Sequence, residues 1–462
     1  MRFRCDLSAP ELSSAELFAE SGAKNVTTIR ASSAFINLAG HKLCLRSRIE
    51  PIPGLLDDWK AGMGVCIWSQ SRCTINDVQT GSPQPVQMLD FSRQFSSIRQ
   101  ELLDAIEEVC TSQRFILGPQ VESFERAAAT ACAVPHAIGC ASGTDAIWLA
   151  LAAANIGPGD AVVTTPFSFF ASVSAILRCG AQALLADIDQ TTFNLSGASV
   201  EEVLRSSAGK KVKAILPVHL YGQCADWDGF TALKDRYGTL LIEDAAQAFG
   251  ATWNGVPAGA LGDAAAFSFY PTKNLSAMGD AGLVTTASAT IDDHARVLRA
   301  HGMRRRYYHD EIGWNSRLDS IQAAILEVKL RYLPEWNRQR REHAARYDEL
   351  FREAKLVGSN VKEGIVLPFT DPRAGNVFHQ YVIRAPRRDG LRQHLTDRKI
   401  GSEIYYPLPL HLQTSLAGLG YKQGDFPASE AAADEVLALP MYAELREDEQ
   451  QIVVDAISGF YA

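Results

Sequence analysis

Polar residues suited to anion binding or to reaction with a carbonyl group stand at three points that adjoin apolar segments. The turn Ala141–Thr144 (ASGT) opens a helix, whose free backbone N–H groups can hold an anion. Asp244 ends an apolar run, and Lys273 follows another. A buried carboxylate requires a cation or a donor, and a desolvated lysine can form a Schiff base. Each also has a plain structural interpretation, as a helix N-cap at Ser142 or Asp244 or as a solvated loop cation at Lys273.

The three features together indicate a particular cofactor more specifically than any one of them alone. A phosphate-binding turn, a carboxylate for a protonated ring nitrogen and a reactive amine are the groups that pyridoxal phosphate (PLP) requires. The stretch Gly157–Val162 (GPGDAV) lacks the third glycine of a dinucleotide-binding loop and follows a helix, which disfavours a Rossmann oxidoreductase. His294, His301 and His309 are too loosely spaced to be metal ligands on one helix face, so no metal site is expected.

A parallel sheet is needed to bring these residues together. Short apolar runs alternate with helical stretches, the runs at 161–165, 183–186, 214–217 and 240–243 and the helices at 170–178 and 227–237. This alternation predicts βαβ units and a largely parallel sheet covered on both faces, with ligands at the carboxyl ends of its strands. The apolar spacing also predicts an amphipathic helix over 95–109 and a long helix from Arg317, interrupted at Pro334 and resumed through Arg352.

Composition narrows the class of protein. The 462 residues are 47% hydrophobic and 21% charged, which is typical of a globular protein with two or three domains. A net charge of −8 argues against binding to nucleic acid. No run is long enough to cross a membrane, and the N-terminus lacks the apolar segment of a signal peptide. Nine scattered cysteines without a CxxC pair fit reduced thiols, so we expect a cytoplasmic protein.

Eight motifs carry a family resemblance from Val86 to the C-terminus: ASGTDA, NIGPGD, PVHLYGQ, IEDAAQA, GDAAAFSFYPTKN, GDAG, NSRLDSIQAA and YPLPLHLQ. In content and order they resemble the sugar aminotransferases of the DegT/DnrJ/EryC1/StrS family. The resemblance implies PLP as cofactor, a homodimer with shared active sites and the aspartate-aminotransferase fold (fold type I). That fold is α/β: residues 86–330 form the PLP-binding large domain with a mainly parallel sheet, and 331–462 form the long helix and a smaller C-terminal α+β domain.

The resemblance also implies a role for individual residues. Lys273 forms the Schiff base with PLP and shuttles the proton, and Asp244 pairs with the pyridine nitrogen. Gln247 contacts the ring hydroxyl, and Phe169 either stacks on the ring or is an ordinary core residue. The phosphate-binding residues implied are Gly143, Thr144, Ser268 and, toward the neighbouring subunit's cofactor, Asn315.

The family resemblance gives a less direct indication of the residues that line the substrate pocket. The basic, aromatic run 301–309 is either a solvated loop or a site for the diphosphate of a nucleotide-activated sugar. The chain departs from the family at Tyr405, where many relatives have His, and at Ser276 and Ala281, where they usually have Gly. A β-carbon at a position of positive φ would cost about 1 kcal/mol or more. The candidate substrate residues are Tyr221, Arg304, Arg317, Tyr405 and His411.

The function that the resemblance implies is transfer of an amino group, from glutamate as the expected donor, to a nucleotide-linked keto-sugar. The lysine loop SFYPTKNL favours the 3-keto position, and the pathway would be amino-sugar biosynthesis for a polysaccharide or an antibiotic. One alternative is an aminotransferase for another keto acceptor, such as a keto-cyclitol, and another is a non-catalytic PLP-fold regulator. A third is the dehydratase branch of the family, which the presence of Lys273 disfavours.

Residues 1–85 form an N-terminal extension whose role the sequence does not give. Relatives begin near Met88, so the extension is interpreted as translated upstream sequence or a poorly ordered appendage, and a chain starting at Met88 is predicted to keep full activity. If the regulatory alternative holds, this extension would instead be the functional part.

Overall fold

The computed structural model describes residues 15–20, 26–32, 35–38, 41–44, 48–49 and 85–462. The chain divides into two units, Met1–Thr80 and Gly81–Ala462. In the first unit, strands β1 (Ala15–Glu20), β2 (Val26–Ser32) and β5 (Arg48–Ile49) form an antiparallel sheet. Strands β3 (Phe35–Leu38) and β4 (His41–Cys44) form a hairpin. Most of the expected extension, and nearly all of its junction with the second unit, lies outside the described residues.

A seven-stranded sheet forms the centre of the second unit, in the order β6-β14-β13-β10-β9-β7-β8. Its strands are β6 (His136–Cys140), β7 (Ala161–Thr164), β8 (Gln182–Leu185), β9 (Val212–Ile215), β10 (Leu240–Asp244), β13 (Ala264–Ser268) and β14 (Gly282–Thr286). Strand β14 is antiparallel to both neighbours, and the pairs from β13 to β8 are parallel. The expected α/β fold with a mainly parallel sheet is confirmed, although the four predicted apolar runs did not include β14.

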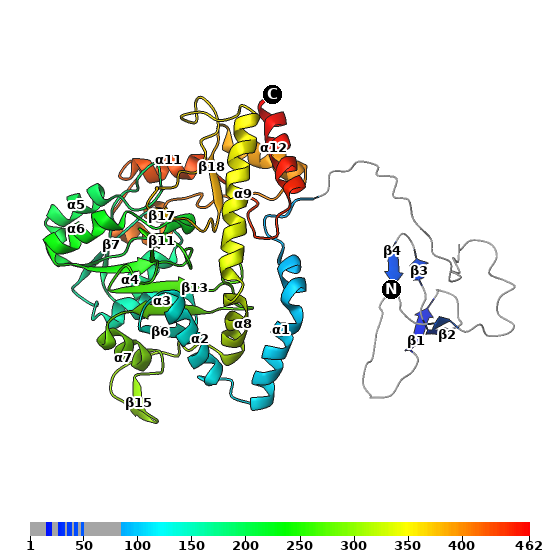
Figure 1. Ribbon diagram of the computed structural model, residues 1–462, viewed down its shortest axis with the longest axis horizontal. Coiled ribbons are helices and arrows are strands. Elements are labelled where there is room, and N and C mark those ends of the chain that lie inside the picture. Colours follow the sequence, from blue (N-terminus) through cyan, green and yellow to red (C-terminus); the bar gives the residue numbers. More distant parts are fainter. Residues whose placement is uncertain (1–14, 21–25, 33–34, 39–40, 45–47, 50–84) are drawn as a thin grey trace. The chain divides into compact units, whose positions relative to one another are not determined.

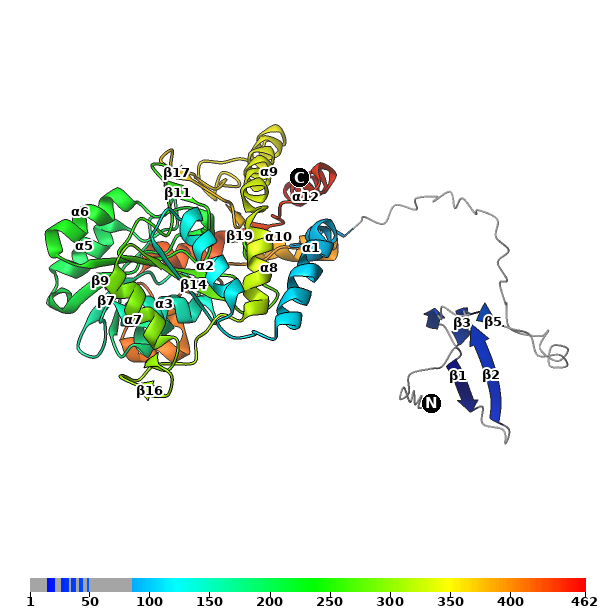
Figure 2. The same ribbon diagram turned by 60° about the horizontal axis from the view of Figure 1, so that its bottom comes forward.

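Helices cover both faces of this sheet (Figures 1 and 2). One face packs against α1 (Phe91–Ser112), α2 (Pro119–Ala131), α5 (Gly197–Arg205), α6 (Trp227–Tyr237) and α8 (Ser320–Leu330). The other packs against α3 (Gly143–Ala153), α4 (Ala171–Arg178) and α7 (Ala289–Leu298). Successive residues of a strand point to opposite faces of the sheet. Leu241 packs with the helices of the first face and Ile242 with those of the other. This two-sided burial explains why the strands are continuous apolar runs.

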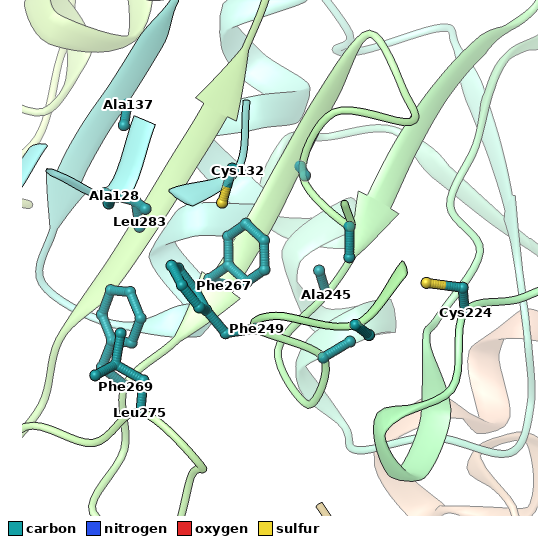
Figure 3. Close-up of a cluster of buried hydrophobic side chains, with 14 of the residues drawn as sticks. Ala128, Cys132, Ala137, Cys224, Ala245, Phe249, Phe267, Phe269, Leu275 and Leu283 are labelled. Atoms are coloured by element: carbon teal, nitrogen blue, oxygen red, sulfur yellow. The ribbon is translucent and has the colours of Figure 1, made fainter. Parts of the chain in front are cut away.

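An aromatic cluster lies beneath the loop that follows β13 (Figure 3). The ring of Phe249 lies 4.9 Å from that of Phe267 and 5.8 Å from that of Phe269, measured between centroids. Leu275 is buried in the same core, two residues after Lys273. The loop that carries Lys273 is therefore held between two buried apolar residues, Phe269 and Leu275.

The helical region after residue 316 differs from the expected long helix. Helix α8 ends at Leu330, and α9 (Leu333–Glu353) begins before Pro334, not after it. Pro334 stands in the first turn of α9, where its missing N–H would have no intrahelical partner in any case. The break therefore lies at residues 331 and 332, and the proline starts the second helix instead of interrupting the first.

The C-terminal part has a smaller core of its own. Strands β18 (Tyr381–Arg384) and β19 (Val436–Leu439) pair antiparallel, and α10 (Arg388–Asp397), α11 (Pro427–Glu435) and α12 (Glu447–Tyr461) pack with them. The remaining short strands are β11 (Thr252–Trp253), β12 (Val256–Pro257), β15 (Met303–Arg305), β16 (Tyr308–His309) and β17 (Ala374–Gly375). Single 3-10 turns are η1 (Ala208–Lys211), η2 (Leu220–Gly222), η3 (Leu410–Leu412) and η4 (Thr414–Leu419).

Neither a membrane helix nor a metal cluster is found in the described part of the chain. Among those residues, no helix is both long and apolar enough to cross a bilayer. The same residues contain no group of three or more His, Cys, Asp or Glu side chains placed to hold a metal ion.

Candidate active site

Lys273 lies in the turn after β13, where its backbone N–H donates to the Tyr270 carbonyl at 2.8 Å. Its side chain is largely withdrawn from solvent. Within residues 85–462 its ammonium group has no hydrogen-bond or ion-pair partner. Burial lowers the pKa of Lys273 to about 8, and the negative charge of Asp244 acts in the opposite direction. The fold therefore presents an amine that is easily deprotonated.

Asp244 is the last residue of β10 and is buried at the carboxyl edge of the sheet. Its Oδ2 accepts a hydrogen bond of 2.7 Å from the hydroxyl of Ser172, on α4, and its Oδ1 accepts one of 3.3 Å from the Ala246 N–H. Burial raises the pKa of Asp244, whereas these hydrogen bonds and the charge of Lys273 lower it. A cationic ring nitrogen would relieve this carboxylate of its desolvation cost.

The neighbouring carboxylate, Glu243, points to the opposite face of the sheet and has a structural role. It accepts hydrogen bonds from the backbone N–H groups of Gly259, Leu261 and Gly262 at 2.8–3.0 Å. His219 Nδ1 accepts from a backbone N–H, so its Nε2 carries the hydrogen that it donates to Glu243 at 3.0 Å. Glu243 thus fixes the loops that flank Asp244.

The start of α3 and the end of β13 form a small cradle for an anion. Ser142 caps α3 by accepting from the Asp145 N–H at 3.1 Å, and the N–H groups of Gly143 and Thr144 have no intrahelical acceptor. A β-carbon at Gly143 would collide with the Ser268 side chain, so glycine permits this close approach. Backbone donors and the Ser268 hydroxyl therefore lie together at a helix N-terminus, as an anion requires.

Gln247 and Phe169 adjoin the Asp244 end of the cluster. Gln247 Oε1 accepts from the Tyr221 N–H at 2.6 Å, and its Nε2 donates to the Tyr406 hydroxyl at 3.2 Å. The Phe169 side chain is 60% exposed, and its ring centroid lies 6.4 Å from that of Tyr406. Phe169 is therefore not a core residue of this chain, and its exposed ring is accessible to the ring of a ligand.

The Lys273 loop is anchored on both sides. Asn274 is buried, and its Nδ2 donates to Asn337 Oδ1 at 2.9 Å and to the Val377 carbonyl at 3.0 Å. Ser276 Oγ accepts from the Lys329 ammonium of α8 at 3.0 Å. Ser276 and Ala281 have no positive φ, so the backbone strain considered for these two departures from the family is absent.

The other predicted residues lie outside this cluster or serve other contacts. Arg304 lies in the exposed β15–β16 hairpin and forms a 2.7 Å ion pair with Asp293 of α7. His411 is buried, and its Nε2 lies 3.0 Å from Glu430 Oε1. Tyr221 is buried and donates its hydroxyl hydrogen to the Tyr405 carbonyl. Asn315 is exposed.

Arg317 differs from these residues in its lack of partners. It is partly buried, and its guanidinium has no hydrogen-bond or ion-pair partner in the described part of the chain; its buried Nε is among the unpartnered polar atoms there. An unpaired cation of this kind suits an anionic group of a ligand or of a partner subunit.

Two residues of the site, Ser172 and Tyr406, were not predicted. Ser172 lies in the first turn of α4, three residues after the predicted Phe169, and its hydroxyl oxygen is 2.9 Å from that of Ser168. Tyr406 adjoins Tyr405, and the sequence gives no local sign of which of the two tyrosines faces Gln247.

The residues present fit PLP. An amine without a partner, a buried carboxylate with room for a cation, and backbone donors in a cradle too narrow for a β-carbon match the cofactor's aldehyde, ring nitrogen and phosphate. Reading the same three features as isolated structural contacts leaves unexplained why the amine of Lys273 has no partner in the described part of the chain.

Comparisons with known proteins point to one aminotransferase family. The model of the DegT/DnrJ/EryC1/StrS aminotransferase family matches residues 96–458. A relative from Geobacillus stearothermophilus, called pleiotropic regulatory protein, is 48% identical over 81% of this chain and 98% of its own. UDP-N-acetyl-3-dehydro-alpha-D-glucosamine 3-aminotransferase from Acidithiobacillus ferrooxidans is 41% identical over 79% of this chain and 95% of its own. The crystal structure of S. venezuelae DesV with a ketimine intermediate has a TM-score of 0.77 and 39% identity, covering 81% of this chain and 98% of DesV.

Proposed function

Because the chain belongs to the DegT/DnrJ/EryC1/StrS aminotransferase family, we propose that it uses PLP to move an amino group from glutamate to a nucleotide-linked keto-sugar. The family resemblance and the expected fold are confirmed, including the large α/β domain and the smaller C-terminal α+β part. The single observation that carries the proposal is that the amine of Lys273, which has no partner in the described part of the chain, and the buried carboxylate of Asp244 lie near enough for each charge to shift the other's pKa.

When bound, PLP supplies an electron-withdrawing ring and a carbonyl carbon that takes up and releases the amino group. Gly143 and Thr144 would bind its phosphate through their N–H groups, together with the Ser268 hydroxyl. Asp244 would keep the ring nitrogen protonated. Lys273 Nζ, whose pKa burial lowers to about 8, would accept a proton from the substrate carbon and return it.

The names of relatives support a sugar acceptor. A relative from Streptomyces venezuelae, 40% identical, is named dTDP-3-amino-3,4,6-trideoxy-alpha-D-glucose transaminase, and a Pseudomonas aeruginosa relative, 34% identical, is named UDP-2-acetamido-2-deoxy-3-oxo-D-glucuronate aminotransferase. The first name places an amino group at position 3 and the second an oxo group at position 3, which supports a 3-keto substrate here. The unpaired Arg317 is our candidate for an anionic group of that substrate.

A homodimer is part of the proposal. Asn315 is exposed, as expected of a residue that serves the partner's site. Large apolar side chains are exposed on α1 and after it, at Phe91, Phe95, Phe115 and Ile116. A second subunit could cover exposed apolar side chains of this kind. A cytoplasmic location remains a prediction.

The regulatory alternative has one observation in its favour, the name of the 48% identical relative. A regulator that only binds a ligand has no need of a lysine with a lowered pKa. An electrophoretic shift of DNA that persists at moderate salt, without turnover of any keto-sugar, would favour this alternative.

The proposal is tested by a product assay. Purified protein with PLP, glutamate and a nucleotide-linked 3-keto-sugar should yield equal amounts of 2-oxoglutarate and the amino sugar, measured by mass spectrometry. Lys273→Ala should lower the rate at least 100-fold, because the group that moves the proton is removed. Equal rates in the two proteins would refute the proposed role of Lys273.

A further inference from the structure

The amide of Gln247 has a defined orientation. A backbone N–H can only donate, so the 2.6 Å contact with the Tyr221 N–H identifies the facing atom of Gln247 as its oxygen. The Gln247 NH₂ group therefore faces the Tyr406 hydroxyl, 3.2 Å away. One of its two hydrogens is used in that contact. The other has no acceptor among residues 85–462.

Tyr406 comes from the C-terminal part of the chain and reaches the large domain at this point. Its ring packs edge-on against Phe167, with centroids 6.2 Å apart, and lies 6.4 Å from Phe169. A second contact joins the same two parts of the chain, because the Tyr221 hydroxyl donates to the Tyr405 carbonyl. The Tyr406 hydroxyl is thus held in place by its own ring contacts and by its backbone neighbour.

The hydroxyl of Tyr406 is a hydrogen-bond donor that has no acceptor among the residues described by the structure. Burial, and next the negative charge of Asp244, raise the pKa of Tyr406 above its ordinary range, and Tyr405 acts in the same direction. Tyr406 therefore keeps its hydrogen at neutral pH. Its oxygen accepts from Gln247, and no described residue accepts the hydrogen that it carries.

We infer that Tyr406 and Gln247 form a two-donor site for one oxygen of the bound PLP, its ring hydroxyl in the ionised form. Two donor atoms 3.2 Å apart can both reach a single acceptor at ordinary hydrogen-bond distance. The family resemblance implies this oxygen as the contact of Gln247 alone, and Tyr406 is the new member. The inference rests on the proposed function, since it assumes that PLP binds beside Asp244.

The same pair of donors suits an oxygen of the sugar, and the two sources make different predictions. If the oxygen belongs to PLP, the loss of one donor makes it more basic before any substrate is added. The pH midpoint of the bound cofactor's visible absorbance then rises, and PLP binds more weakly. If the oxygen belongs to the sugar, both quantities stay unchanged and the KM for the sugar rises.

The test compares the full chain with Tyr406→Phe and with Tyr347→Phe as a matched control. Tyr347 is fully buried and donates its hydroxyl hydrogen to the Pro440 carbonyl at 3.1 Å, in the C-terminal core. Both variants lose one hydroxyl that takes part in a hydrogen bond, so thermal melting should report similar losses of stability. Tyr406→Phe alone should raise the absorbance midpoint by about one pH unit and weaken PLP binding about tenfold, as expected when one hydrogen bond to a charged oxygen is lost.

Gln247→Leu is a second variant that keeps Tyr406 in place, and it should raise the midpoint in the same direction. An unchanged midpoint and unchanged PLP affinity in Tyr406→Phe would overturn the inference while leaving the proposed function intact, and a raised KM for the sugar would then assign the donors to the substrate. Wild-type protein that binds no PLP would overturn the proposed function and the inference with it.

Discussion

At the scale of single residues, the charge of Lys273 determines whether the site can react. With a pKa of about 8, about a tenth of the molecules hold a neutral amine at pH 7. An ordinary lysine, with a pKa near 10.4, would be neutral in well under a thousandth of them. Asp244 limits this effect, because its negative charge favours the ammonium form.

Amine labelling of the cofactor-free protein measures this ionisation directly. The rate at which an acylating reagent modifies Lys273 should rise with pH and reach half its maximum near pH 8, because only the neutral amine reacts. Peptide mass spectrometry separates Lys273 from exposed lysines such as Lys210, which serve as the internal reference. In Asp244→Asn the midpoint should fall below that of the wild type, since the charge that favours the ammonium is gone. A Lys273 midpoint near 10.4 would contradict this account.

Sequence spacing was sufficient to place Asp244 and Lys273 at strand ends, because each follows directly from a local apolar run. Their partners depend on contacts between distant segments. Ser172 donates to Asp244 across 72 residues, and Gln247 meets Tyr406 across 159. Contacts at such separations leave no periodic pattern in one sequence. The partners of Arg304 and His411 lie only 11 and 19 residues away, but in each case beyond one helical turn, and they were visible only in the structure.

At the scale of elements, the Lys273 loop is held by α8 through a buried polar pair. Lys329 is 6% exposed, and its ammonium donates to Ser276 Oγ at 3.0 Å. Burial lowers the pKa of Lys329 to about 8, and the charge of Glu444 opposes that shift. Below pH 8 the ammonium is charged, and Ser276 is its one hydrogen-bond partner in the described part of the chain.

Ser276→Ala should therefore destabilise the cofactor-free protein by about 1–3 kcal/mol at pH 7, because a buried ammonium loses its acceptor. In a Lys329→Met background, the same substitution should cost much less. Urea unfolding of the four proteins at pH 7 gives the coupling free energy between the two positions. Additive costs would show that the two side chains do not stabilise each other.

The elements themselves were predicted well where a short apolar run is bounded by turns, as at β7 and β10. Strand β14 was missed because its sequence, GLVTT, has only two apolar side chains, Leu283 and Val284, after a glycine. The position of the break between α8 and α9 was predicted wrongly because Pro334 was taken as a point of interruption. The first turn of a helix tolerates proline, and only the observed hydrogen bonds distinguish the two cases.

At the scale of the whole molecule, the second unit starts before Met88. The Val86 side chain is 1% exposed, and Val86 pairs with Ile400 as a parallel bridge. Its N–H donates to the Lys399 carbonyl at 3.1 Å, and its carbonyl accepts from the Gly401 N–H at 2.7 Å. The sequence could not reveal this contact, because Val86 directly follows a stretch rich in proline and glycine.

A chain that starts at Pro85 should match the full chain in melting temperature and in turnover. A chain that starts at Met88 should lose roughly 2–4 kcal/mol of stability, from the exposure of the Val86 pocket and the loss of two hydrogen bonds. Urea unfolding and turnover of the three chains check both statements. Equal stability of the two shortened chains would show that the Val86 bridge contributes nothing, and lost turnover in both would assign a function to the extension.

The central claim is that Lys273 makes this chain a PLP-dependent aminotransferase, and its most direct test is the visible absorption spectrum of the PLP-loaded protein during a titration with glutamate. We predict that the band of the covalently bound cofactor is replaced by that of pyridoxamine phosphate, with one equivalent of 2-oxoglutarate released per site. The Lys273→Ala protein should convert at least 100-fold more slowly. A bound cofactor that glutamate does not change, or a Lys273→Ala protein that converts at the wild-type rate, would contradict the account.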